Sequence, residues 1–148
     1  MKVDFIRGLA SDAAQISLIL EDWSETTSWL PKVDNTAERA DYGLWLLEHT
    51  KVTMLRYDDQ CVGFLALEDN IIQSLYIKAA FQRRGFGQAA IYYAQEQFNE
   101  LRLWVFQANN EAQKFYQNMG FEALEMTDGR DNDYGLPDIF YLWRLSGS

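Results

Sequence analysis

The chain has 148 residues, of which 48% are hydrophobic, and a formal net charge of -9 at pH 7. This length suffices for one domain with a substantial core and is too short for two ordinary domains, so we expect a single domain over residues 1–148. The negative charge argues against nucleic acid as the main partner and mildly favours a cationic one.

The sequence shows neither a membrane span nor a secretory leader. An uncharged apolar run of about 18 residues, the length that marks a membrane span, does not occur, and the opening residues MKVDFIRGLASD carry acids where a signal peptide is apolar. The one cysteine, Cys61, cannot form an internal disulfide, and its apolar neighbours predict a buried thiol without a catalytic role. We therefore expect a cytoplasmic protein that has no membrane partner.

The first third of the chain predicts one strand and two helices. Residues 3–8 have the pattern of a short strand, and Ser11 is placed to cap a helix. The buried face of that helix is predicted to consist of Ile16, Ile19, Leu20 and Trp23. In the second helix, Asn35 and Glu38 resemble a capping box. This helix should end near His49 and bury Ala40, Gly43, Leu44 and Leu47.

The rest of the chain alternates strands and helices. Segments 52–57, 61–68 and 71–78, separated by the turns DDQ and DN, predict an antiparallel meander. A helix at 87–98 and a strand at 101–107 then predict a parallel connection. A helix at 111–119 should bury Tyr116 and end at a Gly120 cap, and strands at 121–126 and 139–145 close the chain. The fold class is therefore α/β, a mixed sheet of about seven strands flanked by about four helices.

The stretch QRRGFG lies where a strand ends and a helix begins. Gly85 and Gly87 allow a tight turn and let a ligand approach the backbone, and the start of a helix attracts an anion through its unpaired N–H groups and its dipole. Residues 70–95 contain no aspartate or glutamate but include Lys78, Arg83 and Arg84. This pattern predicts a phosphate site. The alternative is a turn whose arginines are merely solvated.

Two other nucleotide-binding motifs fit this stretch poorly. Gly85, Gly87 and Ala90 match the dinucleotide fingerprint, but the strand that follows ends in WVFQANN and lacks the acidic residue that would hold a ribose. The Gly-Lys-Ser/Thr triplet of a P-loop is also missing from the sequence.

Two motifs in the same order resemble the GNAT superfamily of N-acetyltransferases. QRRGFG is similar to the family's acetyl-CoA signature, and NNEAQKFYQNMGF to its second landmark, which includes Asn109, Ala112 and Tyr116. The resemblance implies a pantetheine paired with the backbone of a strand that contains Leu75, Tyr76 and Ile77. The pyrophosphate would bind the signature, namely Gln82, Arg83, Arg84, Gly85, Phe86, Gly87 and Gln88. Asn109 would contact pantetheine and Tyr116 would serve as the general acid, with Ala112 beside them.

This chemistry is the attack of a neutral amine on a thioester, which needs a proton donor for the departing sulfur. A phenol with a pKa of about 10 stays protonated at neutral pH and can donate to a thiolate. Tyr116 is therefore the candidate acid, and its alternative role is packing.

The base is less well specified, because Gln73 occupies the position where relatives often have glutamate. Glu68 and Asp69 are the candidates, of which Glu68 is preferred, although acids beside a hairpin are commonly just solvated. For His49, a structural role at a helix end is favoured over catalysis.

Two loops rich in acids and aromatic residues, DWSETTSWLPK and TDGRDNDYGLPD, are expected to border the acceptor. Four acids of the second loop would attract a cationic amine, or would only form turns: Asp128, Asp131, Asp133 and Asp138. The second loop lacks the spacing of a calcium loop and the sequence has no zinc-binding cluster, so we expect no metal.

The sequence thus predicts an acetyl-CoA-dependent N-acetyltransferase that acts on a primary amine in a ternary complex, as a monomer or homodimer. Two alternatives remain open. One is a non-catalytic acyl-CoA sensor with the same fold, and the other is a nucleotide-binding module of another class.

Overall fold

The computed structural model describes residues 2–30, 36–132 and 134–146, and side chains of residues 36–40 are outside this description. The chain forms two compact units, Met1–Ala90 and Ile91–Ser148. The described residues form seven strands and four α-helices. None of the helices described is long and apolar enough to cross a bilayer.

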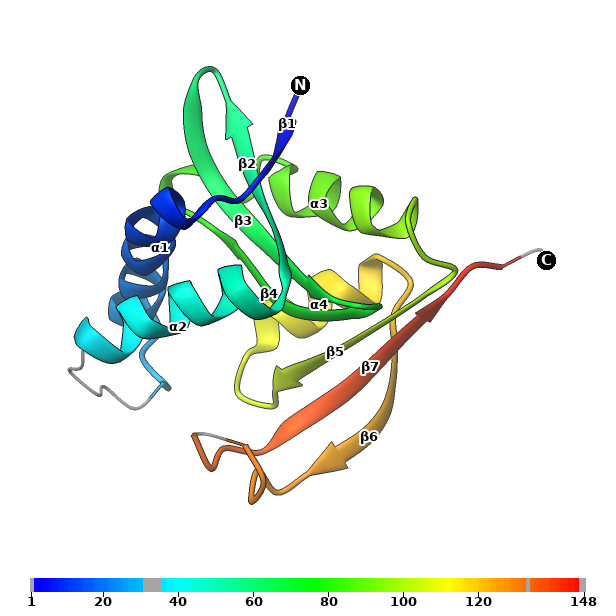
Figure 1. Ribbon diagram of the computed structural model, residues 1–148. Helices are drawn as coiled ribbons and strands as arrows, with labels where there is room; N and C mark the ends of the chain where they lie inside the picture. The colour runs from blue at the N-terminus through cyan, green and yellow to red at the C-terminus, as the bar shows by residue number, and fades with distance from the viewer. Residues whose placement is uncertain (1, 31–35, 133, 147–148) are drawn as a thin grey trace. The chain divides into compact units, whose positions relative to one another are not determined.

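The first unit contains an antiparallel meander of four strands in the order β1-β2-β3-β4 (Figure 1). Its strands are β1 (Asp4–Arg7), β2 (Lys51–Tyr57), β3 (Gln60–Glu68) and β4 (Ile71–Ile77). The two hairpin turns place Asp58, Asp59 and Asp69 at positive φ, which aspartate tolerates better than most residues do. The predicted strands and turns of this meander are confirmed.

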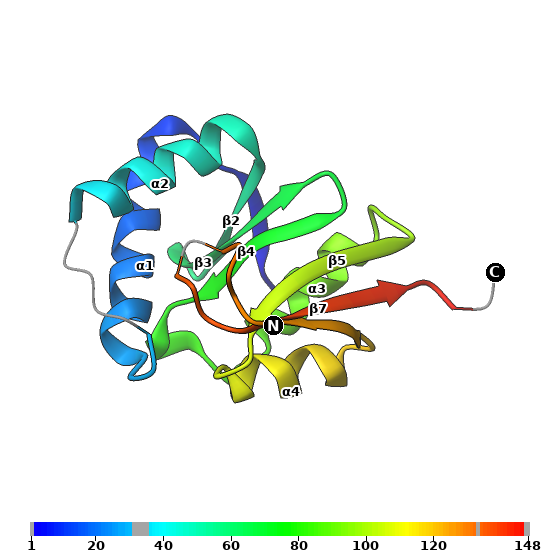
Figure 2. The same ribbon diagram turned by 90° about the horizontal axis from the view of Figure 1, so that it is seen from below.

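Two helices, α1 (Ala13–Thr26) and α2 (Thr36–His49), cover one face of these strands (Figures 1 and 2). Ile16, Ile19 and Leu20 are buried as predicted, whereas Trp23 is half-buried. The helices bury their apolar faces against strand residues in one core cluster: Leu46 joins the three α1 residues there, together with Val52, Met54, Phe64 and Ala66.

The predicted buried face of α2 is wrong at Leu44, which is 41% exposed, while Leu46 is fully buried. The reason is the helix crossing at Gly43. A Cβ there would lie 3.4 Å from the Ala13 carbonyl oxygen and from Ile16, so α1 approaches α2 closely at this point and Leu46 and Leu47 turn toward the strands. The predicted contributions of Asn35, Glu38 and Ala40 lie outside the described residues and side chains.

The predicted Ser11 cap is also wrong. A short 3-10 helix, η1 (Ala10–Asp12), precedes α1, and the Asp12 carboxylate accepts the Leu9 N–H at 2.8 Å. Asp12 therefore closes the turn in which Ser11 lies. Cys61 is half-buried rather than buried, and its thiol faces the Gly63 carbonyl at 3.7 Å.

The second unit contains the strands β5 (Glu100–Phe106), β7 (Asp138–Arg144) and β6 (Glu122–Thr127), side by side in that order and antiparallel. Helix α4 (Asn110–Asn118) covers one face of this sheet (Figures 1 and 2). The face buries five residues: Leu101, Leu103, Val105, Ile139 and Tyr141. The predicted helix and strands are confirmed, and Gly120 ends α4 with a φ of 91° as expected.

Candidate active site

The turn after β4 is held to the end of that strand. The Lys78 N–H donates to the Val62 carbonyl at 2.8 Å, and a short 3-10 helix, η2 (Ala79–Phe81), follows. The Gln82 side-chain amide then donates back to the Ile77 carbonyl at 3.0 Å. The side chain of Gln82, predicted to contact the cofactor, thus fixes the turn to the strand.

The turn has the backbone conformation expected of a phosphate cradle. Arg83 and Gly85 have φ values of 63° and 90°, a region that glycine enters without cost. Helix α3 (Phe86–Gln95) follows directly, one residue earlier than predicted, and the Ala89 N–H makes an early helical bond to the Gly85 carbonyl at 3.0 Å. The N–H groups of Phe86 and Gly87 precede any intrahelical acceptor, which is the arrangement that suits an anion at a helix start.

Arg84 makes contacts that the sequence did not reveal. Its guanidinium carbon lies 5.8 Å from the Tyr57 ring centroid, 5.4 Å from Phe81 and 5.6 Å from Phe86. We call these three rings the Arg84 aromatic box. Cation–π attraction to the box holds the positive charge of Arg84 beside the turn. Phe86, the first residue of α3, is itself almost completely buried.

The predicted pantetheine strand β4 is anchored at Tyr76 by one residue of α1 and one of β3. The ring of Tyr76 packs against Trp23 at 5.1 Å and Phe64 at 5.7 Å. A Cβ at Gly63 would stand 2.3 Å from the Tyr76 carbonyl oxygen, so this glycine is what lets β3 approach β4 at Tyr76 and Ile77. No local sequence pattern indicates this role of Gly63, because it depends on strand pairing.

The candidate base Glu68, at the end of β3, lies far from Leu75 of β4. Glu68 pairs with Ile71 and Leu65 pairs with Leu75, so the two pairs are separated by about 13 Å along β4. The Glu68 carboxylate instead lies 3.5 Å from the side-chain nitrogen of Gln73. The other candidate, Asp69, is exposed in the hairpin turn.

His49 has the structural role that was favoured. Its Nδ1 lies 3.0 Å from the Trp45 carbonyl at the end of α2, and its ring stacks on Trp45 with centroids 4.8 Å apart.

On β4, the buried hydroxyl of Ser74 lies 3.3 Å from that of Tyr42.

The second motif builds the start of α4 in the second unit. Asn109 is the N-cap, because its side-chain oxygen accepts the Ala112 N–H at 3.1 Å. The structure therefore connects two of the predicted cofactor residues, Asn109 and Ala112, through one hydrogen bond. This cap satisfies one of the otherwise unpaired N–H groups at the start of the nine-residue helix.

Tyr116 is 9% exposed and lies between Phe115 and Phe121, with ring centroids 5.0 and 5.4 Å away. Burial disfavours the phenolate and raises the pKa of Tyr116 above its ordinary value. The hydroxyl therefore stays protonated at neutral pH, as a general acid must. The ring contacts show that Tyr116 packs in the core of this unit, and the general-acid role stays a prediction.

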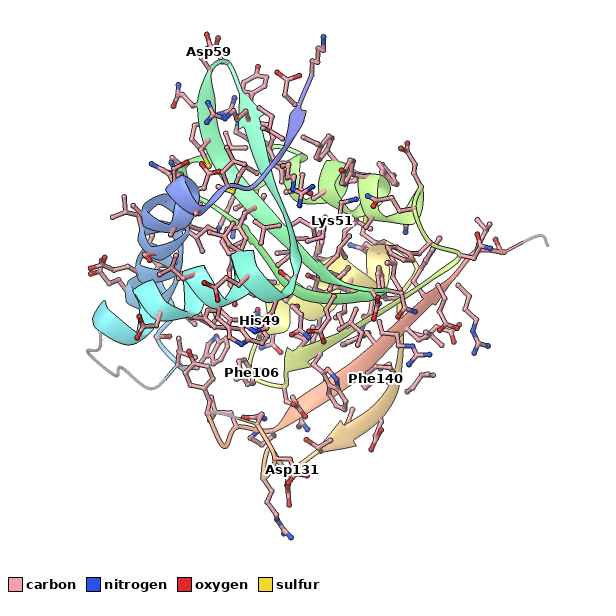
Figure 3. All side chains as sticks on the ribbon, viewed as in Figure 1. His49, Lys51, Asp59, Phe106, Asp131 and Phe140 are labelled. Carbon is pink, nitrogen blue, oxygen red and sulfur yellow. The ribbon has the colours of Figure 1, made fainter. Side chains whose placement is uncertain are left out.

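The acidic loop between β6 and β7 leaves fewer free carboxylates than the sequence suggested. Asp138 is buried and accepts hydrogen bonds from Thr127 and Asn132, and Asp128 pairs with Arg130 at 3.2 Å. Asp131 is exposed on the loop (Figure 3), and Asp133 lies outside the described residues. Among the residues described, no three acidic, histidine or cysteine side chains are grouped to hold a metal ion.

The profile of the Acetyltransferase (GNAT) family matches residues 14–121. This chain belongs to that family. The acetyltransferase is 28% identical over 126 residues to the peptidyl-lysine N-acetyltransferase YiaC of Escherichia coli strain K12. The aligned region covers 76% of this chain and 80% of YiaC.

Solved structures show the same fold as this acetyltransferase. YjaB from Escherichia coli, solved in its apo form, has a TM-score of 0.79 at 20% identity and covers both chains completely. yncA from Salmonella typhimurium, solved with its cofactor acetyl-CoA, has a TM-score of 0.71 at 16% identity. The superposition covers 100% of this chain and 96% of the yncA chain. The predicted α/β class, a seven-stranded mixed sheet with four helices, is confirmed.

Proposed function

We propose that this acetyltransferase transfers the acetyl group of acetyl-CoA to a primary amine by direct transfer in a ternary complex, with residues 1–148 acting as one catalytic domain. The observation that carries the proposal is the turn after β4. Its positive-φ residues, Arg83 and Gly85, lead straight into the start of α3. This geometry suits a pyrophosphate, because backbone N–H groups and the helix dipole converge on an anion there.

The reaction requires that a C–N bond forms as the C–S bond of the thioester breaks. The amine gives up one proton, and the departing sulfur takes one up. We assign the second transfer to Tyr116, whose raised pKa keeps the phenol protonated. Main-chain groups of Leu75 to Ile77 would hold the pantetheine and Asn109 would contact it. Glu68 is retained as a base that acts through water, since its register places it away from Leu75.

For the acceptor we propose the ε-amine of lysine in a polypeptide. The name of the similar YiaC, a peptidyl-lysine N-acetyltransferase, supports this class. The net charge of -9 supports it as well, since an acidic enzyme attracts basic segments. A small-molecule amine would satisfy the same chemistry and serves as the competing acceptor in the test.

The test is thiol release from acetyl-CoA in the presence of lysine-containing peptides, peptides with a free N-terminus and acetylated lysines, and small polyamines. The proposal predicts steady release with lysine peptides and a product that is heavier by one acetyl group. Release that occurs solely with small amines would replace the acceptor class and keep the chemistry.

One observation favours a non-catalytic acyl-CoA sensor as the rival. Gln73, which cannot accept a proton usefully, is held by Glu68, so the candidate base is engaged at the hairpin. A sensor would bind acetyl-CoA tightly and release no thiol with any amine of the panel.

A further inference from the structure

Gln107, the first residue after β5, joins three segments of the second unit. Its N–H donates to the Pro137 carbonyl at 2.8 Å. Its side-chain amide donates to the carbonyls of Thr127 and Asp138 at 3.1 and 3.2 Å. These contacts fix both stems of the loop between β6 and β7 to the end of β5.

Gln113, on the first turn of α4, makes the matching contacts from the helix. Its side-chain amide donates to the Gln107 carbonyl at 2.7 Å and lies 3.4 Å from the Phe106 carbonyl. The two glutamines are therefore connected in series. Gln113 links α4 to the end of β5, and Gln107 links the end of β5 to the loop stems.

The loop itself is closed by Asn132. Its side-chain nitrogen donates to the Leu136 carbonyl at 2.6 Å and to the Asp138 carboxylate at 3.2 Å, and its side-chain oxygen accepts the N–H groups of Tyr134 and Leu136 at 3.1 and 3.3 Å. Gly129 allows the closure, since a Cβ there would stand 2.1 Å from the backbone of Leu136. Every polar group of the Asn132 amide is used to hold one loop shape.

We propose that Gln107 and Gln113 are positioning residues that couple the described loop residues, 128–132 and 134–137, to helix α4. Tyr116 lies one turn beyond Gln113 on the same short helix, so a change in the loop is transmitted to the orientation of the phenol. The coupling depends on hydrogen bonds of half-buried side chains, whose loss leaves carbonyl groups unpaired. The consequence for catalysis rests on the role proposed for Tyr116, but the coupling itself does not.

The first test measures amide hydrogen exchange of the ligand-free protein in the Gln113→Met variant. The described side-chain hydrogen bonds of Gln113 go to the end of β5, yet exchange at the Tyr134 and Leu136 amides should become about fivefold to tenfold faster, the effect of about one lost hydrogen bond. The matched control is Gln117→Met, one turn further along α4, because Gln117 donates to the Tyr141 hydroxyl at 3.3 Å and not to the loop stems. Exchange that is unchanged in Gln113→Met, or equally changed in Gln117→Met, overturns the coupling.

The second test approaches from the opposite end and remains informative if Gln113→Met fails to fold. Asn132→Ala opens the loop, and the amides of Ala112 and Gln113, both bonded to Asn109, should exchange several-fold faster. Coupling between two sites is reciprocal, so an effect in one direction requires the other. Unchanged exchange at the start of α4 in Asn132→Ala contradicts the proposal.

The third test is kinetic and separates positioning from simple loss of structure. Gln113→Met should lower kcat about tenfold and leave the KM for acetyl-CoA within about twofold, because the turn at Arg83 to Gly85 is untouched. Gln117→Met should keep the native kcat. A wild-type protein that releases no thiol would defeat the proposed function, while the exchange experiments would still decide the coupling.

Discussion

Arg84 offers the sharpest test of how the turn after β4 works, because its guanidinium contacts the aromatic box and, in the proposed function, would also attract the pyrophosphate at the start of α3. Replacing Arg84 with methionine removes the charge and retains an apolar chain. The helix dipole is retained in this variant, so the loss is that of one exposed charge pair, about 0.2 to 1 kcal/mol. Acetyl-CoA affinity should therefore fall by up to about fivefold.

Calorimetry at two salt concentrations distinguishes the partners. In Arg84→Met the salt dependence of acetyl-CoA binding should weaken, since one phosphate-facing charge is gone. In Tyr57→Leu, which removes one ring of the box and no charge, affinity should fall by less and the salt dependence should stay native. The double variant should show non-additive losses. The reasoning is refuted if Tyr57→Leu leaves the affinity unchanged, or if it lowers the affinity and the two losses simply add in the double variant.

Three further predictions follow from buried and close-packed residues. Tyr116→Phe keeps the contacts with Phe115 and Phe121 and removes the donated proton, so kcat should fall about 100-fold to 10,000-fold. Because burial raises the pKa of Tyr116, a decline of activity at a pH below that pKa does not come from Tyr116 and should persist in the variant. A native kcat in the variant would mean that Tyr116 only packs. In urea denaturation, Leu46→Ala should lower the free energy of unfolding by about 2 to 5 kcal/mol, whereas Leu44→Ala should change it by less than about 0.5 kcal/mol. Equal losses would contradict the observed buried face of α2. Gly129→Ala should accelerate hydrogen exchange of the Leu136 amide far more than Gly135→Ala, because a Cβ at Gly135 meets no atom within 4 Å. Similar effects in both variants would mean that backbone strain at positive φ, and not the close approach of Leu136, causes the loss.

Most features that depend on local spacing could be predicted from the sequence; the Ser11 cap is the exception, because Asp12 closes that turn instead. The hairpin turns, the glycine-spaced turn at 85–87, the Gly120 cap and the order of elements all depend on residues within one or two turns of each other. The Asn109 cap is equally local, since its bond reaches just to Ala112, but the sequence analysis predicted a cofactor contact for this residue and not a cap. These are interactions that a short stretch of chain determines by itself.

Features that depend on contacts between distant segments could not be predicted. The Arg84 aromatic box needs Tyr57 from β2, and the close approach at Gly63 needs the pairing of β3 with β4. The face of α2 was misassigned because the crossing with α1 at Gly43 decides which leucine is buried. Charge spacing likewise could not show that Asp138 and Asp128 are already engaged by neighbours in the folded loop.

The most direct test of the account compares acetyl-CoA binding by wild type and Gly85→Glu in calorimetry. The variant puts a side chain at a φ of 90° and a negative charge where the pyrophosphate is expected. Two unit charges 4 Å apart repel by about 4 kcal/mol at an effective dielectric constant of 20, so affinity should fall by more than about 100-fold. Gly135→Glu, at a φ of 64° and in open space, is the matched control and should bind normally. Native acetyl-CoA affinity in a folded Gly85→Glu variant would contradict the assignment of this turn as the cofactor site.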